Sequence, residues 1–195
     1  MAYPEKIRTI FIGTPDFAVP SLRALIKDEQ FDIIAVVTQS DKKVGRKQVI
    51  TPPPVKIEAE KNNIPVFQPN KILNLKSQIL NLKPDIIIVI AYAQIIPESI
   101  LDLPKFGCVN VHGSLLPKYR GASPIQAAIL GGDKETGITI MKMAKGLDSG
   151  PILAKKEVKI APSDTSASLY ERLSRLSAET LPEVLKKYIE GKIKP

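Results

Sequence analysis

Cysteine and histidine are almost absent from the sequence, which contains one of each in 195 residues, Cys108 and His112. A single cysteine excludes a disulfide framework within the chain and is typical of a reducing compartment, so we expect a cytoplasmic protein. One histidine without a cysteine pair is a poor set of zinc ligands. We therefore expect no bound metal.

Long hydrophobic runs are missing as well. The longest apolar run, residues 86–91, is far too short to span a bilayer. At the N-terminus, Glu5, Lys6 and Arg8 precede an apolar stretch that leads into Gly13 without a small-residue cleavage site, which argues against a signal peptide. We expect no membrane partner.

Acidic residues are outnumbered, because 28 basic residues face 20 acidic ones and leave a net charge of +8. This excess favours acidic partners, either phosphate-bearing small molecules or nucleic acid, although a lysine-rich surface also serves solubility alone. The hydrophobic share of 44% and the charged share of 25% are ordinary for a globular protein, and the length fits one domain.

Apolar strands and amphipathic helices alternate along the first half of the sequence. The expected strands are residues 6–13, 31–38, 66–67 and 85–92, and the expected helices are residues 17–27, 54–62 and 72–82. Strands that are apolar throughout and separated by helices indicate a parallel sheet covered on both faces. The predicted fold class is α/β, a doubly wound Rossmann-like fold with a mostly parallel sheet and helices on both faces.

The second half is less regular. We expect a strand at residues 108–112, a short helix at 123–130, a strand pair at 139–143 and 151–160, and a helical stretch at 165–190. Pro182 lies within that stretch and is expected to break or kink it.

Turns after the expected strands mark where an open parallel sheet binds its ligands, and they fall at residues 13–17, 92–97 and 113–119. The first turn reads GTPDF and contains neither G-x-G-x-x-G nor G-x-x-x-x-G-K-[ST]. NAD or ATP binding is therefore not expected.

Asn110 and His112 are the first candidates for chemistry. They are two residues apart in the expected strand CVNVH, so their side chains share one face just before a glycine turn. An amide donor beside an imidazole at such a point can stabilise a developing oxyanion. The alternative is that both residues are structural: His112 would make only local hydrogen bonds, and Asn110 would stabilise the geometry of the turn. The side chain of Cys108 lies on the same strand face as those of Asn110 and His112. Its position deeper in the strand favours the role of a small buried hydrophobic residue over that of a nucleophile.

The stretch at residues 109–126 reads VNVHGSLLPKYRGASPIQ and resembles the signature of the folate-dependent formyltransferases. Further stretches match that family in order and spacing: IFIGTPDF at 10–17, DIIIVIAYAQIIP at 85–97 and TGITIMKMAKGLDSGPIL at 136–153. The resemblance therefore covers nearly the whole chain. Its RGASPIQ continuation and TPDF turn are similar to methionyl-tRNA formyltransferases and differ from glycinamide ribonucleotide formyltransferases.

The resemblance implies a catalytic trio of Asn110, His112 and Asp148, with 10-formyltetrahydrofolate as formyl donor and the amino group of initiator methionyl-tRNA as acceptor. Direct attack by a neutral amine would give a tetrahedral oxyanion. Asn110, and also His112, would donate to that oxyanion, and one such donor is worth about 3 kcal/mol. Asp148 would orient the imidazole and help to remove the proton of the amine through water.

The donor site is also implied by the resemblance. Its expected residues are Ser114, Leu115, Leu116 and Pro117, with Tyr92, Ile95, Gly146 and Leu147 enclosing the pterin. An apolar slot edged by backbone donors and acceptors suits a flat heteroaromatic ring. Taken singly, the SLLP stretch is equally an ordinary apolar loop, and Asp148 is equally a turn aspartate.

Residues 39–54 show neither helix nor strand periodicity, and connections of this length are usually functional or disordered. The stretch contains Lys42, Lys43, Arg46 and Lys47 against Asp41 alone. It is either a solvated mobile loop or an arm that grips the acceptor end of tRNA. The resemblance implies the arm, with Arg46 after Gly45 as the tRNA-contacting arginine, and such binding weakens steeply with salt.

Members of the family usually continue into a smaller C-terminal β-barrel that also touches tRNA. The sequence stops at Lys194 and Pro195, so we expect one catalytic domain over residues 1–195 without the barrel, and a monomer. A sugar-nucleotide N-formyltransferase, or a folate- or RNA-binding module without catalysis, is the alternative function.

Overall fold

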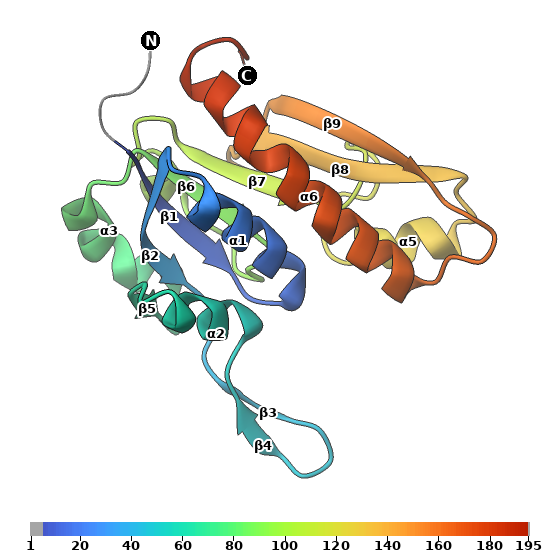
Figure 1. Ribbon diagram of the computed structural model, residues 1–195, viewed down its shortest axis with the longest axis horizontal. Coiled ribbons are helices and arrows are strands. Elements are labelled where there is room, and N and C mark those ends of the chain that lie inside the picture. The colour runs from blue at the N-terminus through green and yellow to red at the C-terminus, as the bar shows by residue number, and fades with distance from the viewer. Residues whose placement is uncertain (1–5, 195) are drawn as a thin grey trace. The chain divides into compact units, whose positions relative to one another are not determined.

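The computed structural model describes residues 6–194 (Figure 1). The chain forms two compact units, one up to Cys108 and one from Val109 onward, and each is described by itself. The prediction of one domain over residues 1–195 stays a prediction.

The first unit is built on a parallel sheet with the strand order β5 (Val66–Phe67), β2 (Phe31–Val37), β1 (Ile7–Gly13) and β6 (Ile86–Ile90). Every residue of β6 is buried, as expected of a β-branched strand covered on both faces. The expected strands of the first half are confirmed, with ends that differ by one or two residues.

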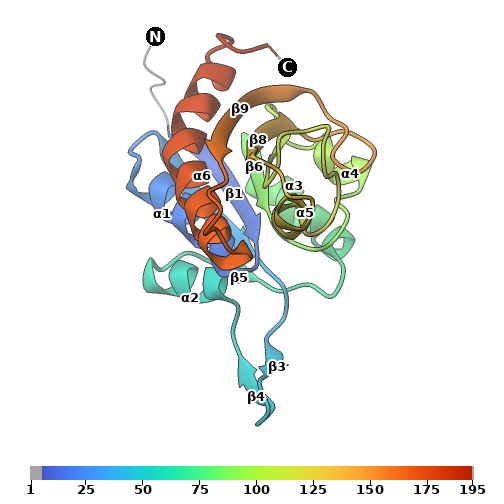
Figure 2. The same cartoon turned by 90° about the vertical axis from the view of Figure 1, so that its right-hand side faces the viewer.

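Helices cover this sheet on both faces. They are η1 (Asp16–Ala18), α1 (Val19–Lys27), α2 (Pro54–Lys61), η2 (Ile72–Leu75), α3 (Lys76–Leu82) and the short α4 (Glu98–Leu101), which the sequence did not predict. Figure 2 shows α1 and α2 on one side of β1 and α3 on the other. Right-handed crossovers produce this arrangement when the strand order reverses, and the α/β, doubly wound prediction is confirmed.

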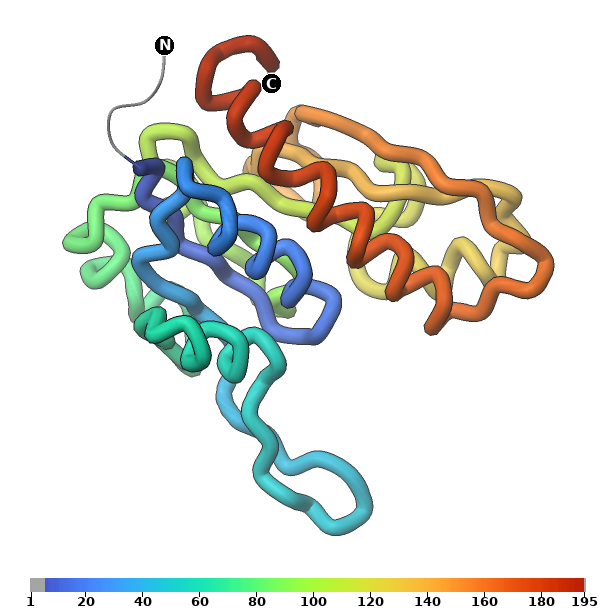
Figure 3. Tube along the Cα trace, viewed as in Figure 1, coloured from blue at the N-terminus to red at the C-terminus, as the bar shows by residue number. Residues whose placement is uncertain are grey.

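Residues 39–54 contain a β-hairpin, which the sequence pattern did not predict. Strand β3 (Lys42–Val44) pairs antiparallel with β4 (Val49–Thr51), and the hairpin extends away from the parallel sheet (Figure 3). Both strands are exposed along their whole length. Because neither face is buried, no alternation of apolar and polar residues reveals them in the sequence.

The second unit has antiparallel strand pairs covered by helices. Strand β7 (Cys108–His112), whose first residue belongs to the first unit, pairs with β8 (Glu135–Lys142), which pairs with β9 (Ile152–Lys159). The long helix α6 (Ser166–Ile189) packs on β8, β9 and α5 (Pro124–Leu130). The predicted pairing of the two strands around residues 139–160 is confirmed.

Helix α6 continues through Pro182 without interruption, so of the predicted break or kink the break is wrong and the kink stays a prediction. Proline removes one backbone hydrogen bond, but Leu181, Val184 and Leu185 beside it are buried. Packing of this apolar stripe stabilises the helix across the missing bond. At the other end, Thr165 and Ser168 form a reciprocal capping box that starts the helix.

Within residues 6–194, no helix has the length and apolar character needed to cross a bilayer.

Tyr92 follows β6 and is one of the largest buried side chains, with 2% of its surface exposed. Its hydroxyl has no hydrogen-bond partner among residues 6–194. Burial favours the uncharged form and raises the pKa of Tyr92 from 10.0 to about 12.

We predict that this tyrosine makes the protein sensitive to alkali. The folded protein holds the Tyr92 proton up to about pH 12, whereas the unfolded chain releases it near 10.0, so the free energy of unfolding falls as the pH rises between these values. The loss amounts to about 2 to 3 kcal/mol at about 1.4 kcal/mol per pKa unit. Denaturant unfolding from pH 9 to pH 12 should show a shallower decline for Tyr92→Phe, and equal declines in both proteins would contradict the prediction.

Candidate active site

Strand β7 presents Asn110 and His112 on one face. Asn110 is half-buried, and His112 is 7% exposed. In the register of the antiparallel pair, Asn110 faces Met141 and His112 faces Thr139 on β8. Paired residues of neighbouring strands project to the same side, so the two candidates lie in rows with these β8 side chains.

Asp148 is brought to the same place by the loop between β8 and β9. Gly150 lies against the backbone of β8, where an added Cβ would overlap the carbonyl oxygen of Lys142, and Gly146 has a φ of 109°. Asp148 itself has a positive φ of 46°. These conformations turn the loop back towards β7, so the Asp148 carboxylate reaches both candidates.

The structure brings the side chains of the trio together. Asn110 Nδ2 donates to Asp148 Oδ1 at 3.4 Å, and His112 Nδ1 lies 3.5 Å from Asp148 Oδ2. The Asp148 carboxylate also accepts a hydrogen bond of 2.8 Å from the backbone N–H of Gly121. The side chains of His112 and Asp148 are only 8% and 12% exposed, so their interaction is shielded from water.

The backbone fixes the tautomer of His112. Its Nε2 lies 2.8 Å from the carbonyl oxygen of Tyr119, which can only accept, so Nε2 is protonated. In the neutral ring, Nδ1 therefore presents its lone pair towards Asp148. A proton can therefore be taken up between His112 Nδ1 and the Asp148 carboxylate. For His112 Nε2 to donate to an oxyanion instead, its hydrogen bond to the Tyr119 carbonyl oxygen would have to break.

Tyr119 and Gly121 are site residues that the sequence reasoning did not single out. Both act through backbone atoms and both have positive φ values, 56° and 91°. The glycine inside the RGAS string is the only signal for this turn, because backbone contacts have no side-chain signature.

The predicted donor loop has two kinds of residue. Ser114 and Leu116 point inward, with 0% and 2% exposure, whereas Leu115 is partly exposed and Pro117 is exposed. Leu147 is 64% exposed and lies against Gly121, where an added Cβ would meet it at 3.2 Å. Of the predicted donor-site residues in this unit, Leu115, Pro117 and Leu147 therefore offer apolar atoms to a ligand.

The sequence matches the family model described as formyl transferase over residues 5–185. The chain belongs to the formyl transferase family. Curated relatives include methionyl-tRNA formyltransferases from Geobacillus sp. (strain WCH70), 51% identical, and Bacillus cytotoxicus (strain DSM 22905 / CIP 110041 / 391-98 / NVH 391-98), 50% identical, each over 191 residues. These alignments cover 97% of this chain and 60% of each relative, so the chain spans 60% of their length.

Solved formyl transferases share the fold. Glycinamide ribonucleotide transformylase 1 from Symbiobacterium toebii has a TM-score of 0.80 at 18% identity, covering 97% of this chain and 90% of that chain. A sugar 3N-formyl transferase, solved in the presence of dTDP and 5-N-formyl-THF, has a TM-score of 0.75 at 25% identity, covering 97% and 65%.

Two predicted donor-site residues, Tyr92 and Ile95, belong to the first unit. Ile95 is 86% exposed, while the Tyr92 ring is buried. The Tyr92 carbonyl oxygen accepts from Gln39 Nε2 at 3.0 Å. The part of both residues in a donor site stays a prediction.

The hairpin arm, residues 42–51, carries the four predicted tRNA-binding residues, Lys42, Lys43, Arg46 and Lys47, and all four are exposed. Val44, Val49 and Ile50 are 55%, 58% and 66% exposed on the same arm. The arm thus combines cations with apolar surface and has few contacts of its own to hold it.

A polar cluster anchors the base of the arm. Lys56 Nζ lies 2.9 Å from Asp41 Oδ2 and donates to Gln68 Oε1, while Gln68 Nε2 donates to Asp41 Oδ1 at 2.7 Å. Gln68 also donates to the carbonyl oxygen of Gln39. The hydrogen bond from Gln68 and then the ammonium of Lys56 hold the pKa of Asp41 below its ordinary value.

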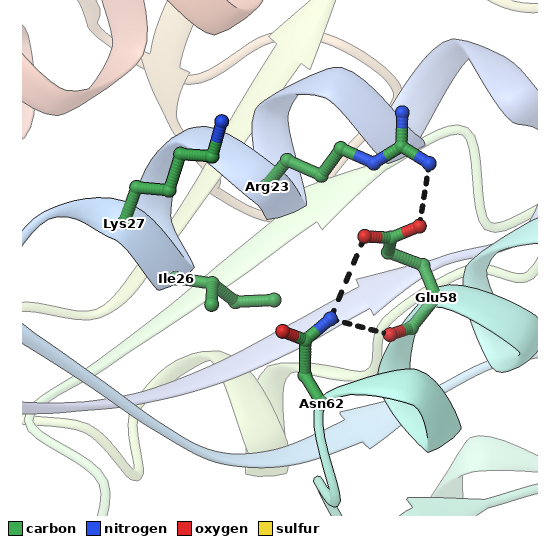
Figure 4. A pocket seen from close by; sticks show the side chains of 5 residues that line it. All are labelled: Arg23, Ile26, Lys27, Glu58 and Asn62. Carbon is green, nitrogen blue, oxygen red and sulfur yellow. Dashed lines mark hydrogen bonds and ion pairs between the residues drawn. The ribbon is translucent and has the colours of Figure 1, made fainter.

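A groove between α1 and α2 in the first unit has a volume of about 350 Å³ (Figure 4). It is lined by Arg23, Ile26, Lys27, Glu58 and Asn62. Arg23 Nη2 lies 2.6 Å from Glu58 Oε2, and Asn62 Nδ2 donates to the Glu58 carbonyl oxygen at 2.9 Å. The hydrogen bond from Arg23 lowers the pKa of Glu58. Because Arg23, Glu58 and Asn62 pair with one another, we interpret the groove as a contact between two helices and not as a ligand site.

Among residues 6–194, no group of three or more histidine, cysteine, aspartate or glutamate side chains is placed to hold a metal ion.

We predict that Lys56→Met loosens the arm. The change removes the cation that contacts Asp41 and Gln68, so the hairpin should open more often. Limited trypsin digestion should cut at Lys42, Lys43, Arg46 or Lys47 severalfold faster than in the wild type. Lys61→Met, at the exposed end of the same helix, is the matched control, and equal rates in all three proteins would refute the anchor.

Proposed function

We propose that the protein transfers the formyl group of 10-formyltetrahydrofolate to the amino group of initiator methionyl-tRNA by direct attack through a tetrahedral intermediate. The observation that carries the proposal is the convergence of Asn110, His112 and Asp148 in a chain that is about 50% identical to methionyl-tRNA formyltransferases over 97% of its length. The convergence of the three side chains alone leaves the acceptor open, and the sequence identity alone leaves the chemistry open.

In the proposed reaction, the neutral amine attacks the formyl carbon and its electron pair forms the new C–N bond. The carbonyl electrons move to the oxygen, and the amide group of Asn110 donates to this oxyanion. Asp148 accepts the proton of the amine through water and shares it with Nδ1 of His112. Collapse of the intermediate breaks the bond to N10 of the folate, and N10 takes up a proton.

The donor would bind against the loop after β7. Leu115 and Pro117 from one side and Gly146 and Leu147 from the other offer apolar contacts beside the trio. Ser114 and Leu116 shape the loop from inside.

The acceptor would be held by the hairpin arm. Lys42, Lys43, Arg46 and Lys47 supply phosphate contacts, and the exposed Val44, Val49 and Ile50 offer apolar contact to bases at an open helix end. The excess of basic residues, +8 overall, supports a polyanionic substrate. We propose that the protein acts in the cytoplasm as a monomer.

The proposed chemistry predicts that Asn110→Ala and Asp148→Asn each lower kcat about 100- to 1,000-fold, because each removes a group that acts in the transition state. Binding of the reduced folate should persist in both. The measurement is formylation of methionyl-tRNA with 10-formyltetrahydrofolate, with folate binding followed separately.

Two outcomes contradict this proposal. Activity that survives both substitutions would overturn the roles of the trio. A preference of the wild type for an amino-sugar nucleotide, offered as a competing acceptor, would overturn methionyl-tRNA as the substrate.

The proposed arm predicts that Arg46→Ala raises the KM for tRNA at least tenfold while the KM for folate changes less than twofold, because the loss of one charge-assisted phosphate contact costs about 1.5 to 3 kcal/mol. The slope of log affinity against log salt should also fall by about 0.7 to 0.9. The control is Lys76→Ala, an exposed cation on α3. If Arg46→Ala raises the KM for tRNA and the KM for folate equally, the arm is not a tRNA contact.

A further inference from the structure

The loop at residues 114–118 is fastened to β8 by one buried hydroxyl. Thr139 Oγ1 donates to the carbonyl oxygen of Ser114 at 2.6 Å and accepts from the backbone N–H of Leu116 at 3.0 Å. Thr139 is 0% exposed, so these bonds do not compete with water. A hydroxyl has one proton to donate, and here it is already used.

Thr139 lies in the row of the proposed catalytic side chains. It is opposite His112 on β7 and opposite Lys155 on β9, and residues so paired project to the same face. The same hydroxyl that fastens the loop therefore belongs to a strand position adjacent to His112. The two hydrogen bonds of Thr139 therefore hold the loop in one position relative to the strand face that carries Asn110 and His112.

Neighbouring groups complete the attachment. Lys155 Nζ donates to the carbonyl oxygen of Leu116, and Ser114 Oγ donates to the carbonyl oxygen of Lys118 at 2.6 Å. Gly137, two residues before Thr139, leaves room for Leu115, whose Cδ2 would be 2.7 Å from an added Cβ. The loop thus directs its backbone groups inward and leaves Leu115 and Pro117 accessible.

We propose that Thr139 is a positioning residue for the formyl donor, a role that rests on the proposed function. It sets the place of the donor loop relative to Asn110 and His112 without touching the reacting atoms. The contacts that hold the trio run through Gly121 and Tyr119 and do not pass through Thr139. Loss of its hydroxyl should therefore weaken donor binding and spare the chemical step.

The test compares Thr139→Val with Thr139→Ser and Thr136→Val in the intact protein. Valine removes the hydroxyl at nearly constant shape and leaves two buried backbone groups unpaired, whereas serine keeps the hydroxyl. Thr136 is 3% exposed on the same strand but of opposite parity, so Thr136→Val controls for a buried threonine lost from β8.

The readouts are the Kd of 5-formyltetrahydrofolate, kcat at saturating 10-formyltetrahydrofolate, and hydrogen exchange of the Leu116 amide. In Thr139→Val we expect the Kd to rise about ten- to a hundredfold and Leu116 exchange to accelerate about tenfold or more, with kcat within about threefold of the wild type. Thr139→Ser and Thr136→Val should remain within about threefold of the wild type in all readouts.

Unchanged donor Kd in folded Thr139→Val overturns the inference, as does an equal loss in Thr136→Val or a failure of serine to rescue. If Thr139→Val does not fold, Lys155→Met takes its place, because the exposed Lys155 holds the same loop through the Leu116 carbonyl oxygen. The inference then requires that Lys155→Met raises the donor Kd. A wild-type protein that binds no reduced folate overturns the proposed function instead, so the two failures are distinguishable.

Discussion

The carboxylate of Asp148 is the group on which the candidate site depends. It is joined to strand β7 through Asn110 and His112 and to the turn after the donor loop through the N–H of Gly121. These partners lie 27 to 38 residues away in the chain, so only the folded unit brings them together. With a side chain 12% exposed, the carboxylate loses much of its solvation and depends on the Asn110 amide and the Gly121 N–H, which donate to it, for stabilisation. The loop that delivers it must accept a positive φ at Asp148 and the close approach of Gly150 to Lys142.

Hydrogen bonding leaves two unlike surfaces on the protein. In the donor loop, Thr139, Lys155 and Ser114 satisfy backbone groups from within, so the loop offers apolar atoms to a ligand. The arm does the reverse, because its strands are exposed on both faces and its cations extend into water. A flat heteroaromatic ring suits the first surface, and a polyanion with open bases suits the second. The bisubstrate reaction proposed for the protein needs one surface of each kind.

The sequence predicted the elements whose burial leaves a periodic signal. The apolar strands at residues 7–13, 31–37 and 86–90 follow from β-branched runs, and the two-residue spacing of Asn110 and His112 places them on one face. It could not predict the hairpin, since strands of three exposed residues leave no pattern, and Gln48 with a φ of 50° has no residue-type signal. The carbonyl of Tyr119 and the hydroxyl of Thr139 were missed because the sequence does not reveal which distant backbone groups a fold brings to them.

The state of His112 connects this geometry to the proposed reaction. Its Nε2–H is committed to Tyr119, and the gap of 3.5 Å between Nδ1 and Asp148 is longer than an ordinary hydrogen bond. Two lone pairs face each other across that gap in the neutral ring, so the contact becomes favourable only when a proton enters it. In the proposed mechanism that proton comes from the attacking amine as the oxyanion forms beside Asn110. The imidazole and carboxylate would then interact most strongly in the charged intermediate, which is the differential stabilisation that catalysis requires. Catalytic hydrogen bonds that are long without substrate and tighten in the complex are expected on the same grounds.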